Sequence, residues 1–274
     1  MSLPLPASLS PSKLSSFRTC PLAFRLSSID GLPEAATQAM AKGTLVHKAL
    51  ERLYVEVPRG ERTPEVAVAL LHDSVASVLS HREHAALHWE EGGRQAFVAD
   101  AEALVRNDFV IEDPNAVDAG GIEVKLRADL DGLSMRGVID RLDVTAEGLV
   151  VTDYKTGRAP SETWEGKQMA GVHFYAFLCE QVLGVRPVRI QLLHLREPVA
   201  LTIEPSDQST RGLGARAAAV WDAVTRCCEQ EDFRPRIGFA CTSCSYQAYC
   251  PAQGGDPSLV PAAAEAVRIE RGAA

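Results

Sequence analysis

Three cysteines near the C-terminus of this 274-residue chain constrain its fold more than any other feature. Cys241, Cys244 and Cys250 stand in a C-x2-C-x5-C arrangement, and Pro251 follows directly. Thiolates at such tight-loop spacing converge on one point, so the set is typical of a metal or iron–sulfur site. The candidate fourth ligand is Cys20, more than two hundred residues upstream. If Cys20 completes the set, the first and last folded segments of the chain must lie side by side.

The composition fits an ordinary globular protein, with 46% hydrophobic and 23% charged residues. No apolar run approaches the roughly 20 residues that a membrane-spanning helix needs, and the N-terminal segment lacks the basic residues of a secretory signal. Seven cysteines, an odd number, favour metal ligation in a reducing cytosol over disulfide bonds. The sequence therefore predicts a cytoplasmic protein without a membrane partner.

The net charge of −8 argues at first against a polyanionic partner. The charge is unevenly distributed, however, because residues 61–118 hold twelve acidic and four basic residues and account for the whole excess. Residues 1–29 and 233–255 contain basic residues and no acidic ones, and both segments include predicted cysteine ligands. Nucleic acid is therefore permitted as a partner, and the acidic section is the face least suited to contact it.

The hydrophobic pattern predicts helices first and a sheet afterwards. Helices are expected after Ser10-Pro11, from Gly43-Thr44 onward, and as two or more segments within 64–111. At Ile122 the period of the apolar residues changes from 3.6 to 2, and Asp131-Gly132 is typical of a hairpin turn. The expected strands are 122–130, 135–144, 149–155, 188–195 and 198–204, with helices at 164–184 and 207–230. This order indicates an α/β or α+β core with a helical insertion.

One face of the central strands carries the candidate chemistry. Asp153 and Lys155 share a face because successive strand side chains alternate, and Tyr154 points the other way. Asp140, on the preceding strand, lies among apolar neighbours, where a carboxylate is costly unless it is paired or binds a metal. Two carboxylates on adjacent strands and a lysine predict a divalent-metal site for phosphodiester hydrolysis. His47 can add an imidazole ligand from its helix.

These motifs resemble the RecB-type nuclease branch of the PD-(D/E)xK superfamily. The residues that carry the resemblance are His47 in Gly-Thr-Leu-Val-His, Asp140 in Gly-Val-Ile-Asp-Arg-Leu-Asp, and Asp153-Tyr-Lys155-Thr-Gly. The opening Leu9-Ser-Pro-Ser-Lys-Leu and Phe17-Arg-Thr-Cys20-Pro segments resemble the same branch. The split cysteine set is similar to that of its iron–sulfur nucleases, including the CRISPR-adaptation nuclease and the AddB subunit. The resemblance covers about residues 9–251.

The resemblance implies a restriction-endonuclease-like αβββαβ core that acts on DNA with Mg²⁺ or Mn²⁺. The implied metal ligands are His47, Asp140, Asp153 and the backbone carbonyl of Tyr154, and Lys155 is expected next to the reacting water. A 4Fe-4S cluster is implied as a staple between the two ends of the chain. Its ligands would be Cys20, Cys241, Cys244 and Cys250. Four thiolates also suit tetrahedral Zn²⁺, so zinc is the alternative.

The helix after the lysine strand departs from the family pattern. The branch usually carries Gln-x3-Tyr there, whereas Gln168 and Tyr175 are seven residues apart and Gly171 stands at the expected glutamine position. Seven residues are about two helical turns, so both side chains still share a helix face. Both are therefore predicted to contact DNA. The other predicted DNA contacts are Arg141, Lys13 and Arg18.

Several residues also have purely structural interpretations. His47 alone is more often a surface or hydrogen-bonded histidine, and a lone Asp-x-Lys is more often a salt-bridged strand pair. Glu123 alternates with apolar residues and is expected to face solvent. The remaining cysteines are expected to pack between helices rather than to bind metal. They are Cys179, Cys227 and Cys228.

The sequence predicts one iron–sulfur nuclease domain over 1–251 and a tail over 252–274. Within the domain we expect a helical section at about 61–118, a nuclease core at about 119–204, and cluster segments at about 9–29 and 233–251. The predicted activity is metal-dependent cleavage of DNA by an exonuclease that prefers single-stranded ends. Repair, recombination or defence are its expected settings, with a helicase or recombination protein as partner. The alternatives are a non-catalytic DNA-binding or assembly module and a redox-sensing iron–sulfur protein on the same fold.

Overall fold

The computed structural model describes residues 2–159 and 162–272, without the side chains of 162–170 and 270–272. The chain divides into two compact units. The terminal unit comprises Met1–Ala35, Arg127–Arg136 and Arg211–Ala274, and the core unit comprises Ala36–Leu126 and Gly137–Thr210. In the described part of the chain, no helix is both long and apolar enough to span a bilayer.

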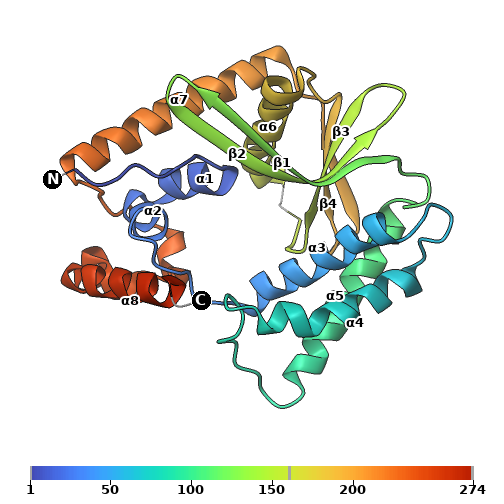
Figure 1. Cartoon of the computed structure of the whole chain (residues 1–274), viewed down its shortest axis with the longest axis horizontal. Coiled ribbons are helices and arrows are strands. Elements are labelled where there is room, and N and C mark those ends of the chain that lie inside the picture. The colour runs from blue at the N-terminus through green and yellow to red at the C-terminus, as the bar shows by residue number, and fades with distance from the viewer. Residues whose placement is uncertain (1, 160–161, 273–274) are drawn as a thin grey trace. The chain divides into compact units, whose positions relative to one another are not determined.

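The sheet has five strands in the order β1-β2-β3-β4-β5. They are β1 (Ala119–Leu130), β2 (Leu133–Val144), β3 (Leu149–Lys155), β4 (Arg189–His194) and β5 (Val199–Ile203). β3 runs antiparallel to β2 and parallel to β4, and β5 is again antiparallel. The parallel pair needs a crossover connection, which α6 (Glu162–Leu183) supplies. All five predicted strands are confirmed, and the order of elements agrees with a PD-(D/E)xK core (Figure 1).

Three helices gather beside the sheet in the core unit (Figure 1). They are α3 (Gln38–Glu56), α4 (Pro64–Ser80) and α5 (Gly93–Ile111). Leu50, Leu71 and Leu104, one from each helix, are fully or almost fully buried and share one apolar cluster with Tyr154 and Leu193 of the sheet. This cluster covers one face of the sheet, so the strand side chains on that face are shielded from water.

The helix that carries His47 begins earlier than its sequence predicts. The prediction placed its start at Gly43-Thr44, but the Thr37 side chain caps it by accepting from the Met40 amide, and α3 begins at Gln38. Gly43 is therefore inside the helix. A Cβ atom at Gly43 would lie 3.4 Å from Oγ1 of Thr156, an ordinary contact distance, so this turn of α3 lies next to the end of β3.

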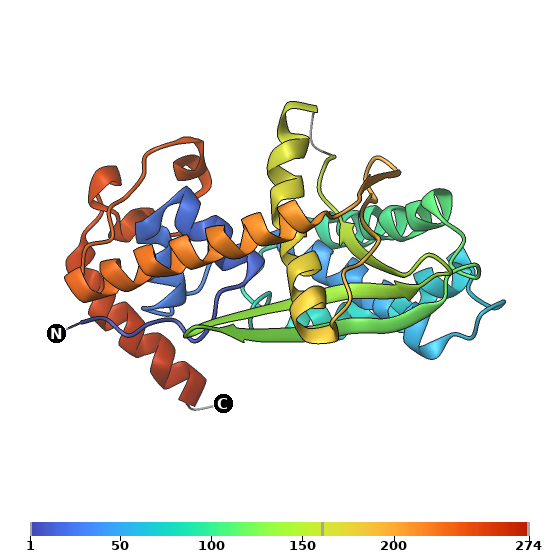
Figure 2. The ribbon, with the colours of Figure 1, turned by 90° about the horizontal axis from the view of Figure 1, so that it is seen from above.

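The terminal unit brings the two ends of the chain together. Its helices are α1 (Pro11–Thr19), α2 (Pro21–Ser28), most of α7 (Asp207–Gln230) and α8 (Val260–Gly272). Phe17 and Phe24 of the N-terminal helices pack with Val224 and Phe233, and both views show α1 and α2 beside α7 (Figures 1 and 2). The position of Cys20 predicted such an apposition of the ends.

Candidate metal site and cysteine cavity

Three potential ligands from three separate elements meet in the core unit. His47 of α3, Glu123 of β1 and Asp140 of β2 each offer one ligand atom, and these atoms all lie within 4.8 Å of one another. Each side chain is partly buried. Carboxylate oxygens with one imidazole are a ligand set that suits Mg²⁺ or Mn²⁺ in proteins. Two of the three, His47 and Asp140, were predicted from the sequence.

The site lies where β2 and β3 part. Their antiparallel pairing ends at Arg141 and Thr152, and beyond this point the Asp140 carboxylate takes over as the partner of β3. Asp140 Oδ2 accepts a hydrogen bond of 2.8 Å from the amide of Tyr154. His47 Nε2 donates to the Tyr154 carbonyl at 3.0 Å, and its Nδ1 lies 3.4 Å from Asp140 Oδ1. The backbone of one residue, Tyr154, thus holds both predicted ligands.

Neighbouring charges raise the pKa of His47. Burial lowers the pKa of this imidazole, but the hydrogen bond to Asp140 and the charges of Asp140 and Asp153 outweigh burial, so the pKa is raised. The two carboxylates therefore favour a positively charged imidazole when no other cation is present. This is the behaviour of a site whose acidic groups lack a sufficient counter-charge.

Asp153 and Lys155 stand beside this group on β3. Lys155 Nζ forms an ion pair with Asp153 Oδ2, and the lysine side chain is 40% exposed while the carboxylate is buried. Burial raises the pKa of Asp153, Lys155 opposes that rise, and Asp140 adds to it. Tyr175 of α6 lies near the Asp153 side chain, and burial, followed by the charge of Asp153, raises the pKa of this tyrosine. On one side of β3, the Asp-x-Lys motif thus presents a carboxylate that is ion-paired and an ammonium group that solvent can reach.

Glu123 is the site residue that the sequence interpretation missed. Period-2 alternation predicts that it faces solvent, yet Glu123 has a φ of 50°, which L-residues with a side chain rarely adopt. The alternation is interrupted there and becomes regular only from Lys125 onward. Burial, followed by the charges of Asp140 and Glu51, raises the pKa of Glu123. Strained backbone of this kind is typical of functional sites, but the strand pattern gives no sign of it.

The predicted DNA contacts have different outcomes. Arg141 is fully buried and its nitrogens are bound inside the protein, so the predicted contact with DNA is wrong for this residue. Tyr175 points to Asp153, and the side chain of Gln168 lies outside the described residues. In the terminal unit Arg18 is exposed, whereas Lys13 is half-buried and donates to the Ser8 carbonyl at 3.2 Å.

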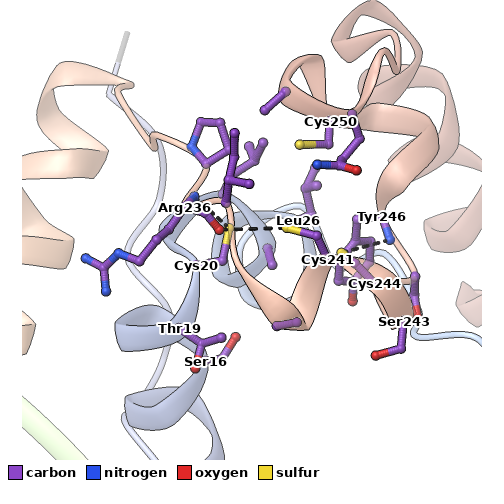
Figure 3. Close-up of a pocket in the computed structure, with 18 of the residues that line it drawn as sticks. Ser16, Thr19, Cys20, Leu26, Arg236, Cys241, Ser243, Cys244, Tyr246 and Cys250 are labelled. Carbon is purple, nitrogen blue, oxygen red and sulfur yellow. Dashed lines mark hydrogen bonds between the residues drawn. The ribbon is translucent and has the colours of Figure 1, made fainter.

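The four predicted cysteine ligands line one cavity of about 430 Å³ in the terminal unit. Figure 3 shows their sulfur atoms turned toward it, with Cys20 on the N-terminal segment and the other three on the C-terminal loops. Cys20 ends α1 and begins α2, and Pro21 follows as the first residue of the new helix. Cys241, Cys244 and Cys250 lie on or next to short 3-10 helices.

Backbone amides point at two of these sulfur atoms. The Arg236 amide donates to Cys20 Sγ and the Tyr246 amide donates to Cys244 Sγ, each at 3.4 Å. Amide hydrogen bonds to sulfur are a common feature of cysteines that bind metals or iron–sulfur clusters. The other cysteines occupy packed positions, because Cys179 and Cys228 are buried and Cys227 packs against the cluster that contains Cys228. Burial raises the pKa of Cys179 to about 11, which disfavours its thiolate.

Comparisons with known proteins concern the family and the fold. The family model of the PD-(D/E)XK nuclease superfamily matches residues 8–251. The crystal structure of a candidate exonuclease from Eubacterium rectale is similar with a TM-score of 0.56 and 11% identity, over 86% of this chain and 87% of that one. The crystal structure of SSO0001 is similar with a TM-score of 0.37 and 17% identity, over 79% of this chain and 98% of that one. The crystal structure of the protein VC1899 from Vibrio cholerae is similar with a TM-score of 0.24 and 13% identity, over 82% of this chain and 57% of that one. No functionally curated protein matches.

Proposed function

Because the chain belongs to the PD-(D/E)XK nuclease superfamily, we propose that it is a deoxyribonuclease that degrades DNA from single-stranded ends. The superfamily implies a metal-dependent phosphodiesterase. The observation that carries the proposal is the convergence of His47, Glu123 and Asp140 at the point where β2 and β3 separate, with Asp153 and Lys155 alongside.

The residues at this point fit a divalent cation. His47, Glu123 and Asp140 would hold it, and Asp153 and the carbonyl of Tyr154 are further oxygen donors at the same edge. When bound, Mg²⁺ or Mn²⁺ activates water and stabilises the leaving oxygen of a phosphodiester. Lys155 would then lose its present partner Asp153 to the cation and would offer its ammonium to the water or to the phosphate.

Exposed side chains of the terminal unit are our reason for proposing single-stranded DNA as the substrate. Arg18 is exposed there, the Arg234 side chain is 85% exposed, and Phe239 is 93% exposed. Exposed aromatic rings stack on unpaired bases, and arginine side chains bind the backbone between them. The name of the Eubacterium rectale protein is in keeping with an exonuclease.

The cysteine cavity supports an iron–sulfur cluster over zinc. In a tetrahedral zinc site with Zn–S bonds of about 2.3 Å, neighbouring sulfurs lie about 3.8 Å apart. Among the described residues, no three cysteine sulfurs lie within 4.8 Å of one another. A cluster of several irons holds its thiolates further apart than a single zinc ion does, and this wider spacing is the reason why we favour the cluster. Such a cluster would act as a staple between the ends of the chain.

Linear and circular single-stranded DNA distinguish the modes of cleavage. We expect the purified protein to degrade end-labelled linear DNA with Mg²⁺ or Mn²⁺ and to leave circular DNA intact. Addition of EDTA should stop the degradation. The variant Asp153→Ala should lose this activity, and Asp129→Ala, which changes a solvent-exposed strand aspartate, should keep it. Cleavage by Asp153→Ala would contradict the proposed site, and cleavage of the circle would contradict the exonuclease assignment.

The cluster is tested by colour and metal content. Protein prepared without oxygen should be brown, absorb broadly near ~400 nm and contain about four irons per chain. Cys241→Ala should bleach it, whereas the matched variant Cys227→Ala should stay coloured, because Cys227 packs on α7 outside the cavity. A colourless protein that contains stoichiometric zinc would contradict the cluster assignment and support the zinc alternative.

A further inference from the structure

A guanidinium is buried in the core unit on the strand face that is opposite Asp140 and Asp153. Arg141 is 0% exposed, and its contacts come from four different elements. Nε and Nη2 donate to the two carboxylate oxygens of Asp143 at 2.7 and 3.0 Å, and Nη2 also donates at 2.9 Å to Glu112, the residue that caps the C-terminus of α5. Nη1 donates to the same Glu112 carboxylate and to the hydroxyls of Tyr54 at 2.5 Å and Tyr154 at 2.6 Å.

This arrangement is rigid for physical reasons. The charge is enclosed in a low-dielectric interior, where each hydrogen bond to it is strong and an unpaired group would be costly. Arg141 also lies over the Tyr54 ring at 4.7 Å and near the Tyr154 ring at 5.7 Å from the guanidinium carbon to each centroid. Thr152, opposite Arg141 on β3, donates to Asp143 at 3.0 Å and accepts from Gln191 of β4 at 2.8 Å. Three neighbouring strands are thereby tied to one side chain.

Tyr154 connects this network to the metal site. Its side chain is 4% exposed and is held by Arg141 on one face of β3. Its backbone amide donates to Asp140, and its carbonyl accepts from His47 at the edge where the strands separate. Because side chain and backbone belong to one residue, a displacement of the ring that shifts the Tyr154 main chain also shifts both groups that position the predicted ligands.

We propose that Arg141 is a positioning residue for the metal site and acts through the hydroxyl of Tyr154. The inference rests on the proposed function, because the groups that are positioned are its metal ligands. It explains why a fully buried arginine follows Asp140 directly: alternation places one residue in the site and the next in the network that stabilises the site from behind. Buried ion networks add little net stability compared with apolar packing, so a gain in geometry is the better reason to keep this one.

The test compares two tyrosines that bind the same nitrogen. Tyr154→Phe and Tyr54→Phe each remove one hydroxyl that accepts from Arg141 Nη1, and each keeps its ring. Only Tyr154 has backbone groups in the site. We expect Tyr154→Phe to weaken Ca²⁺ or Mn²⁺ binding, measured by calorimetry, by about tenfold, and Tyr54→Phe to leave it unchanged. In the metal-free protein, hydrogen exchange of the Tyr154 amide should also be faster in Tyr154→Phe only.

Each outcome decides between the hypotheses. Equal metal affinity for both variants and wild type, with unchanged exchange at the Tyr154 amide, overturns the positioning role and leaves the nuclease proposal intact. An equal loss of affinity in both variants also overturns it, because the effect would then follow general stability. A wild-type protein that binds no metal and cleaves no DNA contradicts the proposed function instead, and the exchange measurement still tests the coupling from hydroxyl to amide.

Discussion

On one face of β2 and β3, the accessible face, Lys155 reaches solvent beside the partly buried Asp140 and the buried Asp153 at the edge where the strands part. Three acidic groups there share one lysine and one histidine. On the other face, Arg141 and Asp143 are enclosed among tyrosines, and the buried charge is bound by hydrogen bonds on all sides. The two faces contain the same kinds of side chain, two residues apart. The difference lies in how the cation is held: Lys155 is 40% exposed and has one carboxylate partner, whereas every nitrogen of Arg141 is hydrogen-bonded in the interior, which makes the second face a rigid support.

The largest effect should come from the accessible face. Replacing Asp153 with Asn should lower the rate of DNA cleavage by about a thousandfold or more, because a ligand and the partner of Lys155 are lost together. The thermal stability of the metal-free variant should be equal to or higher than that of wild type, since a buried charge is removed. Cleavage rates and thermal unfolding are measured on the same preparations. If the variant lost both activity and stability, the proposed difference between the two faces would be contradicted.

On the enclosed face, a substitution should mainly lower the stability of the protein. Arg141→Met leaves Glu112 and Asp143 as buried carboxylates without a partner, so the free energy of unfolding should fall by about 3–5 kcal/mol. Arg127→Met is the matched control, because Arg127 and Asp129 form an ion pair of the same spacing on an exposed strand. This control should unfold as wild type does in urea. Equal stability of both variants would show that the buried network is dispensable.

His47 should have an intermediate effect. If it is a ligand, His47→Ala should weaken metal binding by about tenfold and slow cleavage, and raised Mn²⁺ should restore part of the rate because Glu123 and Asp140 remain. If it serves packing only, the melting temperature should fall while the metal titration curve keeps its midpoint. A calorimetric titration together with thermal unfolding separates the two results.

A further effect concerns pH and the enclosed face. Asp108 is 0% exposed, and burial, with the charge of Glu112, raises its pKa to about 8 from an ordinary value of 3.8. The folded protein therefore retains a proton that the unfolded chain releases. Its contribution to stability is full below about pH 4 and is lost as the pH rises to about 8, at up to about 1.4 kcal/mol per unit. Asp108→Asn should flatten this decline in urea unfolding between pH 5 and 8. Parallel curves for variant and wild type would contradict it.

The sequence by itself determined the order of the elements and much of the candidate site. Strand alternation placed Asp153 and Lys155 on one face, and the cysteine spacing indicated that the two ends of the chain meet. These signals are local: a period of two, a proline after a cysteine and a two-residue turn each act within a few neighbouring residues. Local patterns can therefore be interpreted without knowing what packs against them.

Only the tertiary structure decided which charges are accessible. Arg141 was predicted to contact DNA, but Glu112 and Tyr54, distant in sequence, enclose it. Glu123 was expected to face solvent, but a φ of 50° turns the strand and brings the carboxylate to His47 and Asp140. A charged side chain in a strand has no intrinsic preference for solvent, network or metal, because its environment is supplied by elements far away in the sequence. Partners at long sequence separation leave no periodic signal, so the division between the two faces exists only in the folded chain.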